Sequence, residues 1–193
     1  MGHRLSKIVT RTGDDGTTGL GDGARVAKDS PRIAAMGDID ELNSAIGCVL
    51  AEAVPEPVRA ALAAAQNDLF DLGGEVCIPG REAMAQDHVA QLEHAIEALN
   101  AGLPPLKEFV LPGGDSAAAA CHLARAIGRR AERSLVTLSH GESVSAPALR
   151  YLNRLSDLLF VAARVINRAR ARHETLWKPG RAVKAGVTPV RKT

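Results

Sequence analysis

The sequence is poor in aromatic residues: among its 193 residues there are one Trp, one Tyr and three Phe. Alanine is abundant instead, so the core has to be built from small aliphatic side chains that approach one another closely. Such a core favours packed helices over a β-sandwich, because alanine is the best helix former whereas strands favour aromatic and β-branched residues. The length fits one compact domain better than two.

Cysteine and histidine are not spaced as metal ligands. The six histidines include no H-x-x-x-H or H-E-x-x-H pair, and the three cysteines include no C-x-x-C pair. These spacings disfavour a zinc site. We expect Cys48, Cys77 and Cys121 to be buried free thiols.

Long apolar runs and a charge bias are also missing. No apolar run approaches the roughly 20 residues of a membrane span, and the first residues lack the apolar core of a secretory signal. The net charge is +2, from 24 basic and 22 acidic residues, which is too balanced for general binding to nucleic acid or to a membrane surface. We therefore expect a cytoplasmic protein with neither of these partners.

Hydrophobic periodicity predicts an all-α protein, because no window shows the apolar and polar alternation of a half-buried strand. Short connections between long helices favour antiparallel neighbours, and so an up-and-down five-helix bundle. We expect a single domain, 1–193, with a nucleotide-binding extension (1–29), the bundle (30–173) and a basic tail (174–193). The expected helices start at Pro31 and stop before Pro55, then cover about 57–76, 87–100, 115–138 and 147–173.

A glycine- and threonine-rich segment precedes the first helix. Its glycines allow backbone N–H groups to converge on an anion, and its hydroxyl and cationic side chains add donors for a polyphosphate. It lacks the Gly-Lys-Ser/Thr ending of a P-loop and the bidentate Glu of a calcium loop. A solvated, structureless tail is the open alternative. The candidate phosphate-binding residues are Thr10, Arg11, Thr12, Gly13, Thr17, Thr18 and Lys28.

The fourth helix carries a run of arginines. At 100° per residue, Arg125, Arg129 and Glu132 fall within roughly 60° of one another. Arg130 points to another face of the helix, and Arg133 is the residue directly after Glu132. Guanidinium groups bind phosphate oxygens in pairs, and a nearby carboxylate can orient them or hold the water shell of a metal. The strip therefore suits a nucleoside triphosphate. A solvated helix face with i,i+4 pairs is the alternative.

The fifth helix places an aromatic ring among polar residues, with Asn153, Asp157, Phe160 and Arg164 on one face. A ligand site and a polar seam between helices or subunits explain this face equally well. On the first helix, Asp40 could pair with one of the arginines if the two helices are neighbours.

The segment Phe109-Val110-Leu111-Pro112-Gly113-Gly114 predicts a rigid turn that holds Phe109 at one end of the bundle. A helix connection with a core phenylalanine is the alternative. Taken together, five segments resemble the ATP:cob(I)alamin adenosyltransferases of the propanediol-utilisation (PduO) type over nearly the whole chain. They are the Thr-Arg-Thr-Gly-Asp-Asp-Gly-Thr-Thr segment from Thr10, Gly37–Asn43, Phe109–Gly114, Arg129–Arg133 and Tyr151–Asp157.

The resemblance implies a homotrimer of five-helix bundles with active sites between subunits. ATP would lie across the segment from Thr10 and the fourth-helix strip, with Mg²⁺ bridging its phosphates and metal ligands left unknown. By the same resemblance, Asp40 and Arg125 form an ion pair between subunits near the cobalamin site, and Phe109, assisted by Phe160, covers the lower face of the corrin. The implied ATP-binding residues are Thr10, Arg11, Thr12, Gly13, Thr17, Thr18, Lys28, Arg129, Arg130, Glu132, Arg133 and Asn153.

The implied reaction transfers the 5′-deoxyadenosyl group of ATP to cob(I)alamin and releases triphosphate. Cob(II)alamin is reduced first, and an apolar side chain that excludes the lower axial ligand eases that reduction. Arg129 would stabilise charge on the departing triphosphate. A transient flavin reductase and a B12-dependent acceptor enzyme are the further expected partners. The alternative function is a bundle that carries ATP or cobalamin without catalysis.

Overall fold

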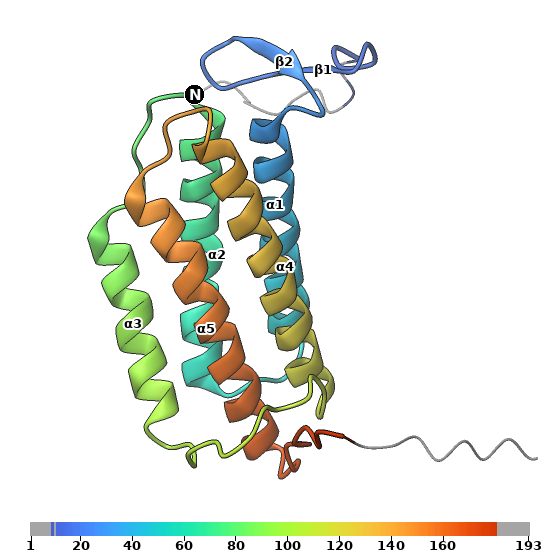
Figure 1. Cartoon of the computed structure of the whole chain (residues 1–193), viewed down its shortest axis with the longest axis vertical. Coiled ribbons are helices and arrows are strands. Elements are labelled where there is room, and N and C mark those ends of the chain that lie inside the picture. Colours follow the sequence, from blue (N-terminus) through green and yellow to red (C-terminus); the bar gives the residue numbers. More distant parts are fainter. Residues whose placement is uncertain (1–8, 10, 181–193) are drawn as a thin grey trace, which may run out of the picture.

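The computed structural model describes residue 9 and residues 11–180 of the chain. Its described part contains five long helices, which confirms the all-α bundle. The helices alternate in direction along the chain (Figure 1). They are α1 (Pro31–Leu50), α2 (Glu56–Cys77), α3 (Gln86–Asn100), α4 (Ser116–Ser139) and α5 (Ala146–Ala169).

The helices do not all pack beside their neighbours in sequence. Helix α1 packs on α2 and α4, and α5 packs on both α4 and α3. Because α5 lies between α3 and α4, the connection at 101–115 has to cross the end of the bundle to reach α4 (Figure 1). This long crossing carries Phe109.

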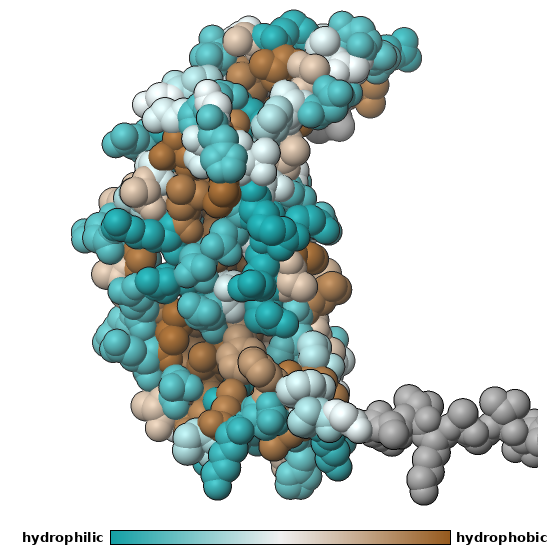
Figure 2. Space-filling view, viewed as in Figure 1, coloured by the Kyte–Doolittle hydropathy of each residue, from teal (hydrophilic) through white to brown (hydrophobic). Residues whose placement is uncertain are grey.

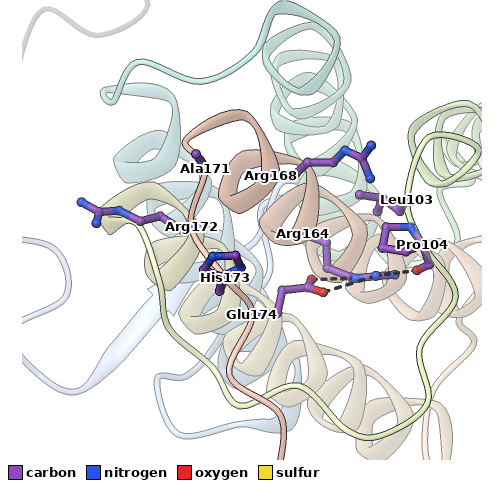
Figure 3. A pocket seen from close by; sticks show the side chains of 8 residues that line it. All are labelled: Leu103, Pro104, Arg164, Arg168, Ala171, Arg172, His173 and Glu174. Atoms are coloured by element: carbon purple, nitrogen blue, oxygen red, sulfur yellow. Dashed lines mark hydrogen bonds and ion pairs between the residues drawn. The ribbon is translucent and has the colours of Figure 1, made fainter.

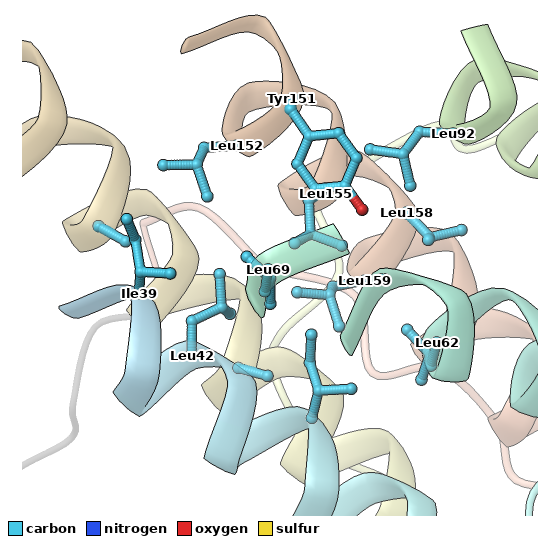
Figure 4. Packing of buried hydrophobic residues seen from close by; sticks show 14 of the residues in the cluster. Ile39, Leu42, Leu62, Leu69, Leu92, Tyr151, Leu152, Leu155, Leu158 and Leu159 are labelled. Atoms are coloured by element: carbon cyan, nitrogen blue, oxygen red, sulfur yellow. The ribbon is translucent and has the colours of Figure 1, made fainter. Parts of the chain in front are cut away.

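The core is made of small aliphatic side chains, as the composition predicts. Helix α4 turns four fully or almost fully buried alanines, Ala117, Ala118, Ala124 and Ala131, towards its neighbours. A Cβ added at Gly128 would touch Leu42 at 3.4 Å, so α1 and α4 approach closely there. Leucines of α2 and α5 fill the centre around Tyr151 (Figure 4). Tyr151 donates a hydrogen bond to Asp68 Oδ2 at 2.8 Å.

The extension before α1 contains a short antiparallel hairpin, which the sequence did not predict. Strand β1 (Thr17–Gly19) pairs with β2 (Arg25–Ala27). Three-residue strands are too short to show a period, so the expectation of no strand was wrong here for a local reason. The hairpin loop is attached to the bundle, because Gly21 N–H donates to the Cys77 carbonyl at 3.0 Å and a Cβ at Gly21 would collide with Ile78.

Helix α5 ends four residues before the expected His173. Ala171 has a φ of +52°, the left-handed conformation that ends helices. The N–H of Arg172 then donates to the Asn167 carbonyl at 2.8 Å. Residues after this cap run back along the connection between α3 and α4, and this tertiary pairing is why the helix does not continue.

Replacing Ala171 by glycine is expected to raise the free energy of unfolding by about 0.5 kcal/mol. Relief of the left-handed strain, roughly 1–2 kcal/mol, exceeds the extra backbone entropy of glycine, roughly 0.5–1 kcal/mol. Urea unfolding of wild type and variant measures the change. Ala169→Gly, two residues earlier at the last helical position of α5, is the matched control and should not be stabilising. An Ala171→Gly protein less stable than wild type would contradict the assigned backbone strain.

No helix in the described part of the chain is long and apolar enough to cross a membrane.

Cys121 is buried and Cys77 half-buried, but Cys48 is exposed, so the expectation of three buried thiols was wrong for Cys48. Cys48 directly precedes the buried Val49 but lies on the outward face of α1.

Candidate active site

A cavity of about 460 Å³ lies where the 101–115 connection crosses the end of the bundle. The connection lines one side of it with the residues from Leu106 to Val110, while Arg125 of α4 and Phe160 of α5 line the other. Phe109 is 73% exposed, so the core-phenylalanine alternative is wrong. The structure thus brings together three residues predicted separately from three segments.

The C-terminal segment after α5 pairs with the Phe109 segment. Trp177 N–H donates to the Phe109 carbonyl and Leu111 N–H to the Thr175 carbonyl, both at 2.8 Å. The Trp177 and Phe109 rings meet edge to face, with their centroids 6.2 Å apart. The sequence predicted no role for Trp177, because no residue near it indicates a partner 68 positions earlier in the chain.

Buried polar groups without partners lie behind this cavity. Arg125 is half-buried, and its Nε atom has no hydrogen-bond partner among the described residues. Both ring nitrogens of the buried His122 are likewise unpartnered within the described part, and its ring lies 6.1 Å from that of Phe160. Burial lowers the pKa of His122 below its ordinary value of 6.5, and the Arg125 guanidinium lowers it further, against an opposing effect of Glu174.

The lowered pKa predicts that acid destabilises the fold through His122. Above pH 6.5 the imidazole is neutral in both the folded and the unfolded chain. Below pH 6.5 the unfolded chain binds the proton more readily than the folded chain does. The free energy of unfolding therefore decreases as the pH decreases. The fall in melting temperature between pH 7.5 and 5.5 should therefore be smaller in His122→Leu than in wild type. His94→Gln, at an exposed histidine, is the control and should leave the slope unchanged. Equal slopes in all three proteins would contradict this assignment.

The predicted strip on α4 lies against α5. Asn153 Nδ2 donates to Glu132 Oε1 at 2.9 Å, and Asn153 Oδ1 accepts from Arg154 at 2.6 Å. Arg129 and Arg133 are exposed, and the Arg129 guanidinium makes no hydrogen bond or ion pair with the described residues. Its positive charge is therefore available to an anion.

Arg130 lies on another face of α4, as its position in the sequence predicts. Its Nε donates to Asp38 Oδ1 at 2.9 Å, and its Nη2 pairs with Glu41 of α1. Asp40 pairs with no arginine in the described part of this chain. It is exposed and lines a separate cavity of about 330 Å³ between α1 and α2, beside Phe70, which is 76% exposed. No local pattern in the sequence indicates a role for Phe70.

The described part of the extension is held by contacts among its own side chains, so a structureless tail is wrong for residues 11–28. Lys28 Nζ donates to the Gly13 carbonyl at 2.7 Å. Arg25 donates to the Thr12 carbonyl and through Nε to Thr17 Oγ1 at 3.1 Å. A Cβ at Gly13 would lie 2.9 Å from Lys28 Nζ and 3.0 Å from the Thr17 carbonyl oxygen, so the chain passes close to both groups there. Thr10 lies outside the described residues.

The candidate residues follow one another along the bundle. Arg125, at the cavity, is one helical turn, roughly 6 Å, from Arg129, and α4 then continues towards the end of the bundle that carries the hairpin (Figure 1). On the face of the molecule shown in Figure 2, hydrophobic residues are exposed among the hydrophilic ones. Fold and site together define a helical-bundle protein with an arginine-bearing face, suited to a phosphorylated ligand. Beside it lies a cavity lined by two phenylalanines and by charged side chains, suited to a second ligand with an apolar face.

Comparison with known proteins agrees with this class. A family model described as cobalamin adenosyltransferase matches residues 8–166. A cobalamin adenosyltransferase of Cupriavidus metallidurans is 58% identical over 179 residues, which are 92% of this chain and 97% of the relative. A corrinoid adenosyltransferase of Mycobacterium tuberculosis is 47% identical over 190 residues, 93% of this chain and 97% of the relative. The chain belongs to the cobalamin adenosyltransferase family, which confirms the resemblance seen in the sequence.

A solved structure shows the same fold. It is that of a variant PduO-type ATP:corrinoid adenosyltransferase from Lactobacillus reuteri, complexed with cobalamin and ATP. It superposes with a TM-score of 0.84 at 34% identity, covering 89% of this chain and 99% of that one.

Proposed function

We infer that this protein transfers the 5′-deoxyadenosyl group of ATP to cob(I)alamin, forming adenosylcobalamin and triphosphate. The observation that carries this proposal is the placement of Arg125, Phe109 and Phe160 around one cavity, one helical turn from the free guanidinium of Arg129. A corrin in the cavity and a nucleotide on the strip would then be neighbours, as the reaction requires.

The nucleotide site is proposed to combine the extension and the strip. Backbone N–H groups and hydroxyls of residues 10–18 would contact phosphate oxygens, and Lys28 would add a positive charge. Arg129 and Arg133 would bind the triphosphate, with Asn153 keeping Glu132 in place through its 2.9 Å hydrogen bond. Arg130 is already paired with two carboxylates, so its predicted ATP contact requires these pairs to loosen.

Mg²⁺ is proposed to arrive with ATP. Mg²⁺ bound to nucleotides takes most of its ligands from phosphates and water and needs only one or two protein carboxylates. Glu132, half-buried on the strip, would contact its water shell.

Phe109 is proposed to cover the lower face of the corrin. Its exposed phenyl ring offers no lone pair, so it would exclude both water and the base from the lower axial position and ease reduction of the metal. The cobalt of the substrate is then the nucleophile, and the protein has to supply only position, exclusion of water and charge. Arg129 would stabilise the triphosphate that leaves.

A homotrimer with sites between subunits is part of the proposal. Arg125 Nε has no partner within the described chain, and Asp40 is exposed on a different face, so an Asp40–Arg125 pair would need two subunits. We expect sedimentation equilibrium to give three times the 20.3 kDa chain mass. Asp40→Arg, which opposes two positive charges, should weaken the trimer, while a monomeric wild type would contradict it. The reductase, the acceptor enzyme and a cytoplasmic location remain predictions.

One experiment separates the enzyme from a carrier without catalysis. The protein is mixed with ATP, Mg²⁺, cob(II)alamin and a reduced flavin, and the visible spectrum is followed for formation of the cobalt–carbon bond. Repeated turnover and release of triphosphate support the enzyme. Binding of both ligands without the new bond, even with chemically prepared cob(I)alamin, supports the carrier.

A further inference from the structure

Two buried polar residues of α5 hold both ends of the segment that carries Phe109. Arg164, 4% exposed, donates from Nη2 to the Pro104 carbonyl at 2.8 Å, before Phe109. Asn167, 1% exposed, donates from Nδ2 to the Gly113 carbonyl at 3.1 Å and accepts from Asp115 N–H at 2.9 Å, after it. The two side chains are three residues apart on α5 and so lie on one face of the helix.

Arg164 also fixes the C-terminal segment that pairs with Phe109. Its Nε donates to Glu174 Oε1 at 2.8 Å, and Figure 3 shows its guanidinium between Glu174 and Pro104. Three residues after Glu174, Trp177 makes its backbone and ring contacts with Phe109. One guanidinium therefore joins α5, the α3–α4 connection and the C-terminal segment.

Asn167 fits a backbone that only glycine allows. Gly114 has a φ of +107°, and a Cβ there would overlap the Asn167 amide. The amide can thus reach the main chain on both sides of the turn at once, with its donor and its acceptor both used. Apart from its edge-to-face contact with Trp177, the Phe109 ring is mostly exposed, so these bonds rather than burial of the ring hold the segment.

We propose that Arg164 and Asn167 are positioning residues that set the place of Phe109 in the corrin cavity, an inference that rests on the proposed function. Neither residue is proposed to contact the corrin, ATP or a reacting atom. They act through the main chain of residues 104–115, whose two ends they hold against the rigid helix α5. The ring is fixed by this main chain and by the Trp177 contact, whose segment Arg164 also holds, so it moves when those ends move, and small displacements at a reacting centre are costly.

The test uses two assays that share every step except the one Phe109 serves. In the first, reduced flavin gives one electron to protein-bound cob(II)alamin, and the cob(I)alamin formed attacks C5′ of ATP. The cobalt–carbon bond forms as the C5′–O bond breaks and triphosphate leaves. In the second, cob(I)alamin is prepared beforehand with excess chemical reductant. The variants are Asn167→Ala and Arg164→Lys, and the control is Arg168→Ala, whose exposed side chain makes no hydrogen bond or ion pair with the described residues.

Asn167→Ala is expected to lower kcat about tenfold or more in the flavin assay, with less than about threefold loss in the cob(I)alamin assay and an unchanged KM for ATP. The absorption spectrum of bound cob(II)alamin should show a smaller fraction of the four-coordinate form, in which the cobalt has no axial ligand. Arg164→Lys keeps the charge beside Glu174 but cannot reach both partners, so it should give a smaller loss of the same kind. Arg168→Ala should behave as wild type.

A merely structural role would lower the melting temperature and leave the ratio of the two rates unchanged, and that result would overturn the proposal. Should Asn167→Ala fail to fold, Arg164→Lys decides the question alone, and a rate ratio equal to wild type overturns it. Failure of the wild-type protein in both assays would instead overturn the proposed function.

Discussion

Phe109→Ala is expected to reduce adenosylation from cob(II)alamin about a hundredfold, or ~2.7 kcal/mol in the barrier, while the Kd for ATP changes less than about twofold. The ring is 73% exposed and lines the cavity with Arg125 and Phe160, so its removal opens the lower axial position to water without unfolding the chain. A water ligand raises the energy of the orbital that accepts the electron, and reduction slows.

The control for this variant is Leu111→Ala, in the same segment but outside the cavity lining and 43% exposed. It should keep most of the activity. The measurement is the rate of cobalt–carbon bond formation, together with the spectrum of bound cob(II)alamin. A Phe109→Ala protein that turns over at the wild-type rate would show that the ring does not exclude an axial ligand.

Arg129→Ala is expected to lower kcat by roughly a hundredfold to a thousandfold, the usual effect of removing one charge-stabilising donor. The guanidinium makes no pair with the described residues, so its replacement leaves no buried group unsatisfied and should cost little stability. Arg129→Lys keeps the charge but loses bidentate geometry, and should lie between wild type and alanine.

Steady-state kinetics with saturating cob(I)alamin measure this effect, because that assay omits reduction of the metal. Arg172→Ala is the control, since it removes an exposed arginine beyond the end of α5. If Arg129→Ala raised only the KM for ATP and left kcat intact, Arg129 would bind the ground state without favouring the transition state.

Much of the fold follows from local sequence patterns. Apolar residues at helical spacing predicted five helices, and Pro31 and the turn at 111–114 marked where α1 and α4 begin. The same spacing placed Arg125 with Arg129 and set Arg130 apart, because the faces of a helix depend only on its period. The hairpin was missed because its strands are too short to show a period, and the early end of α5 was missed because the residues after it pair with the distant Phe109 segment.

The candidate site was also predictable from local sequence patterns only in part. Residue chemistry at helical spacing was sufficient to select the strip and Phe160, and five ordered segments were sufficient to suggest the family. The contacts of Trp177, Asn167 and Arg164 with the Phe109 segment could not be read from the chain, because each joins segments separated by tens of residues.

The sequence by itself determined the helices, the small-residue core and the polar faces, all of which depend on residues three or four positions apart. Only the tertiary structure decided that α5 lies between α3 and α4. That placement forces the connection to cross the end of the bundle and leaves Phe109 exposed beside Arg125 and Phe160. The physical reason is that helix order depends on the burial of whole faces against one another, a property of the packed chain rather than of any local segment.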